Sequence, residues 1–285
     1  MRPPLARALL ACAALVFALV GGVPAASASS SGFNDWNCRP SAAHPRPVLL
    51  LHGLGGNGPG NFLSLGPFLA GQGYCVFAPT YGEALPPIPV GGFVHIDQSA
   101  KEIAGTIDQI LAATGADRLD LVGHSEGGFQ SLYVPKFTGR ADRIDRVVAL
   151  APPTHGTTFA NLVTIAQKLG IMPQVNQVLQ AAGCAACTEL VTGGASVAKL
   201  TTGPIAQPGV TYTVLASHSD ALVTPNDTAF VREPGVTNAY VQDTCPNDPV
   251  GHIGLAYDSG VAQLIANALD PAHTRPVTCT IGLGF

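Results

Sequence analysis

The sequence is poor in charge, and its few basic residues are scattered. Only 11% of the 285 residues are charged, the formal net charge is −4, and lysine and arginine form no cluster. Such a chain lacks the positive surface that binds nucleic acid or an anionic membrane, so we expect neither partner. The sequence also lacks a repeat of fixed period, which argues against a repeat architecture. We expect a monomer.

An apolar run long enough to cross a bilayer is also missing. The apolar stretch 8–20 is shorter than the about 20 residues of a transmembrane helix. Two arginines precede it and the small residues Ala26-Ser27-Ala28 follow it, which is typical of a secretory signal peptide. A lipid-attachment site at Cys12 is a weaker alternative, because it would leave the signal almost no apolar core. We predict a signal peptide over residues 1–28, one catalytic domain over residues 29–285 without an integral membrane segment, and secretion.

The cysteines fit an exported protein. Of the seven, Cys12 lies in the predicted signal peptide, and the even number that remains indicates disulfides. Zinc or redox chemistry at the Cys184-Ala185-Ala186-Cys187 spacing is less favoured, because no second ligand pair is apparent, and we expect no metal site. Six cysteines allow 15 pairings. The pairs that we predict are Cys38–Cys75, Cys184–Cys187 and Cys245–Cys279.

Short apolar runs alternate with amphipathic helical patterns along the chain. This alternation predicts an α/β fold with a mostly parallel central sheet and helices on both faces. A helix is indicated from Ile96 to a stop at Gly115, and another over 259–269. A helix should also begin at Ser125 and be kinked or ended by Pro135. The predicted strands are residues 48–51, 74–77, 119–122, 146–150, 211–215 and 237–242.

Residues 159–200 do not follow the alternation. They contain helical, apolar segments in a connection longer than a single crossover needs. We predict a helical cap or lid insert over the site, with Leu169, Ile171 and Met172 at its pocket-facing edge. The alternative is a crossover whose apolar residues simply pack in the core.

The nucleophile is predicted from residues 119–128, which read as a strand, a sharp turn and the start of a helix. The turn Gly123-His124-Ser125-Glu126-Gly127 has the Gly-x-Ser-x-Gly pattern of the nucleophile elbow, which exposes a serine Oγ at the carboxyl end of a sheet. The alternative is an ordinary glycine-rich turn, which does not need an apolar strand before it and a helix after it. We therefore predict Ser125 as the nucleophile of acyl transfer.

Acyl transfer also needs hydrogen-bond donors for the oxyanion. One should be the backbone N–H of Glu126, the residue after the nucleophile, with its side chain turned away from the cavity. The second should come from the loop His52-Gly53-Leu54-Gly55-Gly56 after the first strand, and we choose the N–H of Leu54. The His52 side chain is expected to be structural.

The base and the acid should follow Ser125 in the order acid, then histidine. His252 comes after the last strand and before the last helix, where the base belongs, and is preferred to His155, His218 and His273. Asp220 follows the strand at 211–215 and is the predicted acid, with Asp243 as the alternative. Asp227 and Asp248 also remain, with turn or capping roles as their simpler interpretation.

These features together resemble the secreted bacterial, particularly actinobacterial, triacylglycerol lipases of the lipase class 2 group, in the α/β-hydrolase superfamily. The resemblance implies the α/β-hydrolase fold, a Ser125-Asp220-His252 triad and no organic cofactor. It also implies hydrolysis of lipid or other apolar esters, including substrates at an oil–water interface. The sequence departs from the pattern at Gly55-Gly56, at Pro135 and in the lid region. The matching stretches are residues 51–53, 73–77, 120–125, 151–157, 220–225 and 276–279.

Other functions share this machinery. A polyester or cutin-type esterase, a thioesterase or a peptidase uses the same triad, because the triad sets the chemistry while the pocket selects the substrate. A haloperoxidase-like activity is a further, less favoured alternative. A non-catalytic surface binding protein on a hydrolase scaffold would usually lack one triad member, and this chain has a candidate for each.

Overall fold

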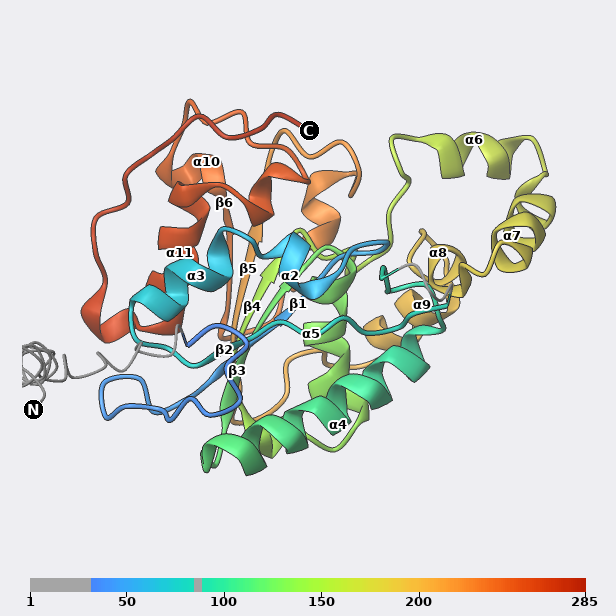
Figure 1. Cartoon of the computed structure of the whole chain (residues 1–285). Helices are drawn as coiled ribbons and strands as arrows, with labels where there is room; N and C mark the ends of the chain where they lie inside the picture. The colour runs from blue at the N-terminus through green and yellow to red at the C-terminus, as the bar shows by residue number, and fades with distance from the viewer. Residues whose placement is uncertain (1–31, 85–88) are drawn as a thin grey trace, which may run out of the picture. The chain divides into compact units, whose positions relative to one another are not determined.

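The central sheet has six parallel strands. A computed structural model describes residues 32–84 and 89–285, and the predicted signal peptide lies outside the described residues. The strand order is β2-β1-β3-β4-β5-β6, the mostly parallel arrangement predicted (Figure 1). The strands are β1 (Val48–Leu51), β2 (Val76–Phe77), β3 (Leu119–His124), β4 (Ile144–Leu150), β5 (Thr211–Ala216) and β6 (Val236–Tyr240).

The two edge strands differ most from their predicted bounds. β2 has only two residues, and β6 ends at Tyr240 rather than at residue 242. The next residues form a helical turn, α10 (Val241–Thr244), because the Asp243 carboxylate accepts a hydrogen bond from the Tyr240 N–H at 2.8 Å. A side chain that caps the helix therefore ends the strand.

The helices match the predicted ones where those were defined. The helix from Ile96 ends at Gly115, whose φ of 75° suits glycine. The helix after Ser125 begins one residue later than predicted and continues two residues beyond Pro135. The helices are α2 (Gly58–Asn61), α3 (Leu65–Gly71), α4 (Ile96–Thr114), α5 (Glu126–Phe137), α6 (Leu162–Lys168), α7 (Met172–Ala181), α8 (Ala185–Glu189), α9 (Ala195–Thr201), α10 and α11 (Ser259–Leu269), with short 3-10 turns η1 (Ala141–Arg143), η2 (Asn226–Ala229), η3 (Gly254–Ala256) and η4 (Pro271–His273).

Helices cover both faces of the sheet. Alternate residues of β1 enter two separate cores, Leu49 and Leu51 on one face and Val48 and Leu50 on the other. The first core is closed by α4 and α5 and the second by α3 and α11 (Figure 1). Burial on both faces explains why the β1 sequence is continuously apolar.

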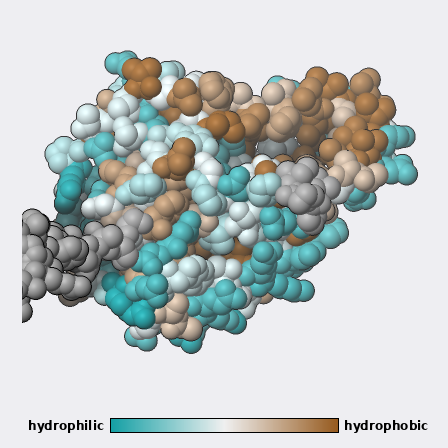
Figure 2. Space-filling view, in the orientation of Figure 1, coloured by the Kyte–Doolittle hydropathy of each residue, from teal (hydrophilic) through white to brown (hydrophobic). Residues whose placement is uncertain are grey.

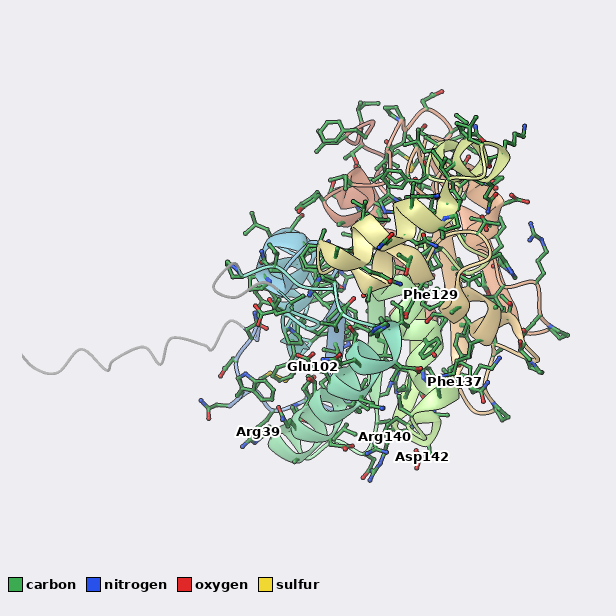
Figure 3. All side chains as sticks on the ribbon, turned by 90° about the vertical axis from the view of Figure 1, so that its right-hand side faces the viewer. Arg39, Glu102, Phe129, Phe137, Arg140 and Asp142 are labelled. Atoms are coloured by element: carbon green, nitrogen blue, oxygen red, sulfur yellow. A yellow bond between two sulfur atoms is a disulfide. The ribbon has the colours of Figure 1, made fainter. Side chains whose placement is uncertain are left out.

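Helix α5 carries a row of aromatic side chains toward α9. Phe129, Tyr133 and Phe137 follow one another with ring centroids 5.7 and 4.5 Å apart (Figure 3). Lys199 of α9 places its Nζ 5.2 and 4.8 Å from the centroids of the Tyr133 and Phe137 rings. Lys136 of α5 also donates to the Leu200 carbonyl at 2.6 Å. These contacts fix α9 against the body of the domain.

Helices α6 to α9 make up the long connection between β4 and β5. The Glu189 carboxylate of α8 accepts hydrogen bonds from His95 Nδ1 at 2.6 Å and from the Ile96 N–H at 2.9 Å, which ties α8 to α4. Helix α7 has no buried residue, and with α6 it stands away from the sheet in Figure 1. Helices α8 and α9 are thus fixed to the body of the domain, whereas α7 has no buried residue to anchor it.

Three disulfides link the six cysteines of the described residues, and they are the three pairs that we expected. They are Cys38–Cys75, Cys184–Cys187 and Cys245–Cys279. The third fixes the chain after α11 to the segment that follows α10. None of the helices in the described part of the chain is both long and apolar enough to cross a membrane.

Candidate active site

Ser125 lies in a strained turn between β3 and α5. Its φ of 58° and ψ of −119° are unusual for a residue with a side chain. The turn depends on its glycines, because a Cβ at Gly123 would lie 2.0 Å from the Gly127 carbonyl oxygen. A Cβ at Gly127 would lie 1.9 Å from the Leu51 carbonyl oxygen, so strand and helix meet only without these side chains.

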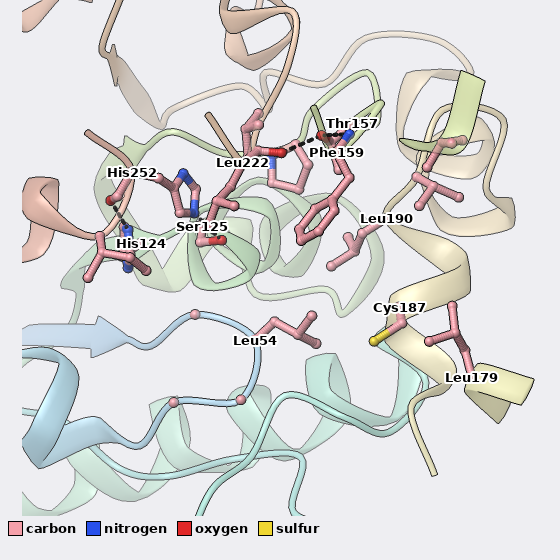
Figure 4. Close-up of a pocket in the computed structure, with 18 of the residues that line it drawn as sticks. Leu54, His124, Ser125, Thr157, Phe159, Leu179, Cys187, Leu190, Leu222 and His252 are labelled. Carbon is pink, nitrogen blue, oxygen red and sulfur yellow. Dashed lines mark hydrogen bonds between the residues drawn. The ribbon is translucent and has the colours of Figure 1, made fainter. Parts of the chain in front are cut away.

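The structure brings Ser125, His252 and Asp220 together from three loops at the carboxyl end of the sheet. Ser125 Oγ lies 2.8 Å from His252 Nε2 (Figure 4), and His252 Nδ1 lies 2.7 Å from Asp220 Oδ2. Asp220 and His252 are buried. The other Asp220 oxygen accepts the N–H groups of Leu222 and Val223, both at 2.8 Å, which orients the carboxylate toward the imidazole.

The alternative acids have other partners. Asp243 caps α10, and Asp227 pairs with Arg232 at 2.9 Å. Asp248 Oδ1 accepts the N–H groups of Val250 and Gly282. Asp243 and Asp248 thus have the capping and turn roles that the sequence allowed for them, whereas Asp227 forms an ion pair.

The alternative histidines also lie in other surroundings. His155 is hydrogen-bonded to the Phe230 carbonyl at 3.1 Å, and His273 pairs with Asp270 at 2.9 Å. The His218 ring stacks on Tyr240 with centroids 3.7 Å apart. Across the described ranges, no three His, Cys, Asp or Glu side chains converge as a metal site would require.

The loop that follows β1, residues 52–56 (the β1 loop), borders the site. Leu54 lines the cavity beside Ser125, and its side chain is 39% exposed (Figure 4). Among the described residues, no acceptor is found for the backbone N–H of Leu54 or of Glu126. Neither N–H is therefore committed to a protein acceptor in this part of the chain.

The His52 side chain supports this loop through two hydrogen bonds. Its Nδ1 donates to the Gly53 carbonyl at 2.8 Å, and its Nε2 accepts the Tyr81 N–H at 3.1 Å. Burial lowers the pKa of His52 to about 4, which keeps the ring neutral. This is the structural role that the sequence suggested.

The Glu126 side chain points into the protein rather than into the cavity lining. It is completely buried beside the Gln130 side chain, and burial outweighs the hydrogen-bonding influence of that amide on the carboxyl group. A Cβ at Gly92 would lie 2.4 Å from Glu126 Oε2, so only glycine leaves room for this carboxyl. Burial raises the pKa of Glu126 well above its usual range.

A cavity of about 830 Å³ opens at Ser125 and extends beneath α6, α7 and α8. Met172 lines it, but Leu169 and Ile171 are exposed outside the lining, so two of the three predicted edge residues are wrong. Helix α7 turns its Met172 face inward, whereas Leu169 and Ile171 belong to the turn before the helix. The apolar lining of this part includes Leu162, Val163, Met172, Val175, Leu179 and Leu190.

Two further polar residues at the site were not identified from the sequence. Asn61 of α2 accepts the Gly53 N–H at 2.9 Å, and His124 contacts the His252 backbone. The position of His124 next to Ser125 in the elbow could have identified it from the sequence. No sequence pattern identifies Asn61, because one of its partners, His124, lies far away in the sequence.

Comparison with known proteins agrees with the fold. Residues 46–182 match the family model described as alpha/beta hydrolase fold. The chain has the α/β-hydrolase fold and is a distant relative of bacterial triacylglycerol lipases. A triacylglycerol lipase of Pseudarthrobacter phenanthrenivorans is 30% identical over 43% of this chain and 37% of its own length. One of Burkholderia plantarii is 30% identical over 43% of this chain and 33% of its own length. The match thus spans about a third of these relatives.

Solved structures share the fold of this chain. Aspergillus fumigatus lipase B superimposes with a TM-score of 0.59 at 18% identity, covering 82% of this chain and 53% of that one. The propeptide form of a Bacillus licheniformis lipase gives a TM-score of 0.60 at 18% identity, covering 85% and 54%. At such identity the likeness extends to the fold alone.

Proposed function

We propose that this chain is a secreted serine carboxylic-ester hydrolase that acts as a lipase on acylglycerols or other apolar esters. The observation that carries the proposal is the chain of two short hydrogen bonds from Ser125 through His252 to Asp220, at the end of a large apolar cavity. The relatives named triacylglycerol lipases support the choice of substrate class.

The first step is acylation of Ser125. His252 Nε2 takes the hydroxyl proton as Oγ attacks the ester carbonyl carbon, and Asp220 stabilises the imidazolium. The N–H groups of Leu54 and Glu126 donate to the oxyanion of the tetrahedral intermediate. When the intermediate collapses, the alkoxide leaves with the proton from Nε2, and the acyl group remains on Oγ.

The second step is hydrolysis of the acyl-enzyme. A water molecule gives a proton to Nε2 and attacks the acyl carbon, and the same two N–H groups hold the new oxyanion. Collapse breaks the bond to Oγ, which recovers the proton from Nε2, and the carboxylic acid departs. The buried, doubly hydrogen-bonded Asp220 supports this cycle, because it stays oriented while the imidazole changes charge.

The cavity supports an apolar acyl group. Leu179, Cys187 and Leu190 lie on the far side of the cavity from His252 in Figure 4, and they leave a path free of charge for an alkyl chain. Near α2 and the loop of His252, the cavity is lined by the polar side chains of Asn57, Asn61 and Tyr257. The alcohol part of an ester could be hydrogen-bonded there.

The segment 159–200 fits a cap over this cavity. Several of its apolar side chains are 43–67% exposed, among them Phe159, Leu162, Ile165, Leu169, Ile171 and Val178. Figure 2 shows the apolar surface gathered over α6 and α7. An apolar surface beside an apolar cavity is suited to contact with lipid when the cap opens. The three disulfides support export, where such bonds persist.

Labelling with a fluorophosphonate and replacement of Ser125 test the proposal. The native protein should be labelled and should hydrolyse esters, whereas Ser125→Ala should remain folded, escape labelling and lose at least about a thousandfold in kcat/KM. His252→Ala should behave similarly, and Asp220→Asn should lose somewhat less. Near-normal turnover by Ser125→Ala, purified free of contaminating esterase, would overturn the assignment.

A matched control and a substrate panel complete the test. Asp243→Asn removes a carboxylate that caps α10, and it should leave turnover nearly intact; a greater loss than in Asp220→Asn would mean that the acid is wrong. Hydrolysis of long-chain triglyceride, short nitrophenyl esters, thioesters and polymer films should be compared. A preference for polymer films would indicate a polyester esterase instead of a lipase, and a preference for thioesters would indicate a thioesterase.

A further inference from the structure

A partly buried chain of hydrogen bonds connects the β1 loop to the loop of His252. The Gly53 N–H donates to Asn61 Oδ1 at 2.9 Å, and His124 Nδ1 lies 3.3 Å from both Nδ2 and Oδ1 of Asn61. His124 Nε2 in turn lies 2.9 Å from the carbonyl oxygen of His252, the contact drawn between these residues in Figure 4. The chain therefore passes beside Ser125, from one loop of the site to the other.

The direction of every hydrogen bond in this chain is fixed by its two ends. The Gly53 N–H can only donate, so the Asn61 oxygen faces it and the Asn61 NH₂ faces His124. The His252 carbonyl can only accept, so His124 carries its proton on Nε2 and accepts at Nδ1. Burial lowers the pKa of His124 to about 3, which preserves this neutral form.

Each residue of the chain adjoins a group that the proposed mechanism uses. Gly53 precedes the oxyanion donor Leu54, and His124 precedes the nucleophile Ser125. His252 is held at both ends, because Asp220 binds its ring at 2.7 Å while His124 binds its backbone. Small displacements of such groups cost rate, because attack needs the reacting atoms in near-attack geometry.

We propose that His124 and Asn61 are positioning residues, which set the oxyanion loop and the base at a fixed distance on either side of Ser125. This inference rests on the proposed function. A neutral His124 also avoids a second positive charge beside the imidazolium, since the two rings have centroids only 5.0 Å apart.

Replacement of His124 separates positioning from stability. His124→Leu keeps an apolar side chain of similar bulk but removes both hydrogen bonds, and it should lower kcat about 10- to 100-fold with little change in KM. His124→Gln should recover most of the lost kcat, because its carboxamide NH₂ can reach the His252 carbonyl. Steady-state kinetics on a soluble short-chain ester give the split between kcat and KM.

A double-mutant cycle tests whether the two residues act as one chain. Asn61→Leu should also lower kcat, and the variant with both replacements should lose no more than the worse single one, because either break interrupts the same chain. Thr114→Val is the matched control, since it removes a buried hydrogen bond of 2.7 Å within α4, far from the site. It should lower the melting temperature without lowering kcat.

Three results would overturn the inference while the proposed function stands. They are an unchanged kcat in His124→Leu, additive losses in the cycle, or a loss of kcat that simply follows the melting temperature as in the control. Failure of the proposed function looks different: the native protein would escape fluorophosphonate labelling, or Ser125→Ala would keep its activity. In that case the inference falls with the function on which it rests.

Discussion

The two parts of Glu126 face different surroundings. Its backbone N–H borders Ser125 at the start of α5, while its carboxyl group is buried against Gly92 and beside Gln130. An ionised carboxylate there would oppose an oxyanion that develops close by. Burial raises the pKa of this group, and the protonated form removes the conflict.

Glu126→Gln should therefore change how stability depends on pH. The folded protein holds Glu126 protonated above the ordinary pKa of 4.5, whereas the unfolded chain releases that proton. Stability from this group is thus complete below pH 4.5 and is lost as the pH rises. The free energy of unfolding of the variant, measured with urea from pH 4 to 8, should gain on that of the native protein by up to about 1.4 kcal/mol per pH unit. A difference that stays constant over this range contradicts the assignment, and Glu83→Gln, at an exposed position, controls for net charge.

How much of the site the sequence could predict depends on the range of each interaction. The elbow around Ser125 is specified by residues within a few positions, so its local pattern was sufficient. The Asn61–His124 contact joins residues 63 positions apart, and no local pattern marks it. Likewise, the role of Glu126 depends on Gly92, which only the folded chain places against its carboxyl group.

Among the elements, the strands and major helices followed from periodicity, whereas the residues of the cap that line the cavity did not. Parallel strands buried on both faces give continuous apolar runs such as β1, which are conspicuous in a sequence. Leu169 and Ile171 lie in the turn before helix α7, and the side of the cap that this turn faces depends on where α7 docks. This is why Met172 lines the cavity while Leu169 and Ile171 do not.

Replacing the exposed apolar residues of the cap tests its role. The triple variant Leu169→Ser, Ile171→Ser, Val178→Ser alters side chains that are 66, 43 and 67% exposed, so the melting temperature should barely change. Hydrolysis of an emulsified long-chain ester should fall severalfold, while hydrolysis of a soluble short-chain ester should persist.

The control for the cap variant is Leu63→Ser, which alters a side chain that is 71% exposed and outside the cap. It should affect neither substrate. A fall of many degrees in the melting temperature of the triple variant, with equal loss on both esters, would mean that the segment is core.

At the scale of the whole molecule, the disulfides restrain the chain unequally. Cys245 and Cys279 are 34 positions apart, whereas Cys184 and Cys187 are separated by three. Because a longer loop restrains the unfolded chain more, replacing the first pair by serine should lower the free energy of unfolding by about 3–4 kcal/mol, against about 2 kcal/mol for the second. Urea unfolding of the two double variants without reductant measures this. Equal losses would show that native-state contacts, not chain entropy, dominate.

The order of the strands has a consequence for how fast the molecule folds. The register pairs Val48 of β1 with Asp120 of β3, so the strand that presents Ser125 meets β1 only after a loop of roughly seventy residues closes, whereas its pairing with β4 is more local. Sheets dominated by such distant pairings fold slowly, over about milliseconds to seconds or longer, compared with helical bundles. A chain that leaves the cell unfolded benefits from this delay, since its strands stay unpaired while it is threaded through a membrane pore. Under the secretion that we propose, the same topology that gathers the reactive groups at one edge of the sheet thus favours assembly of the sheet only after export.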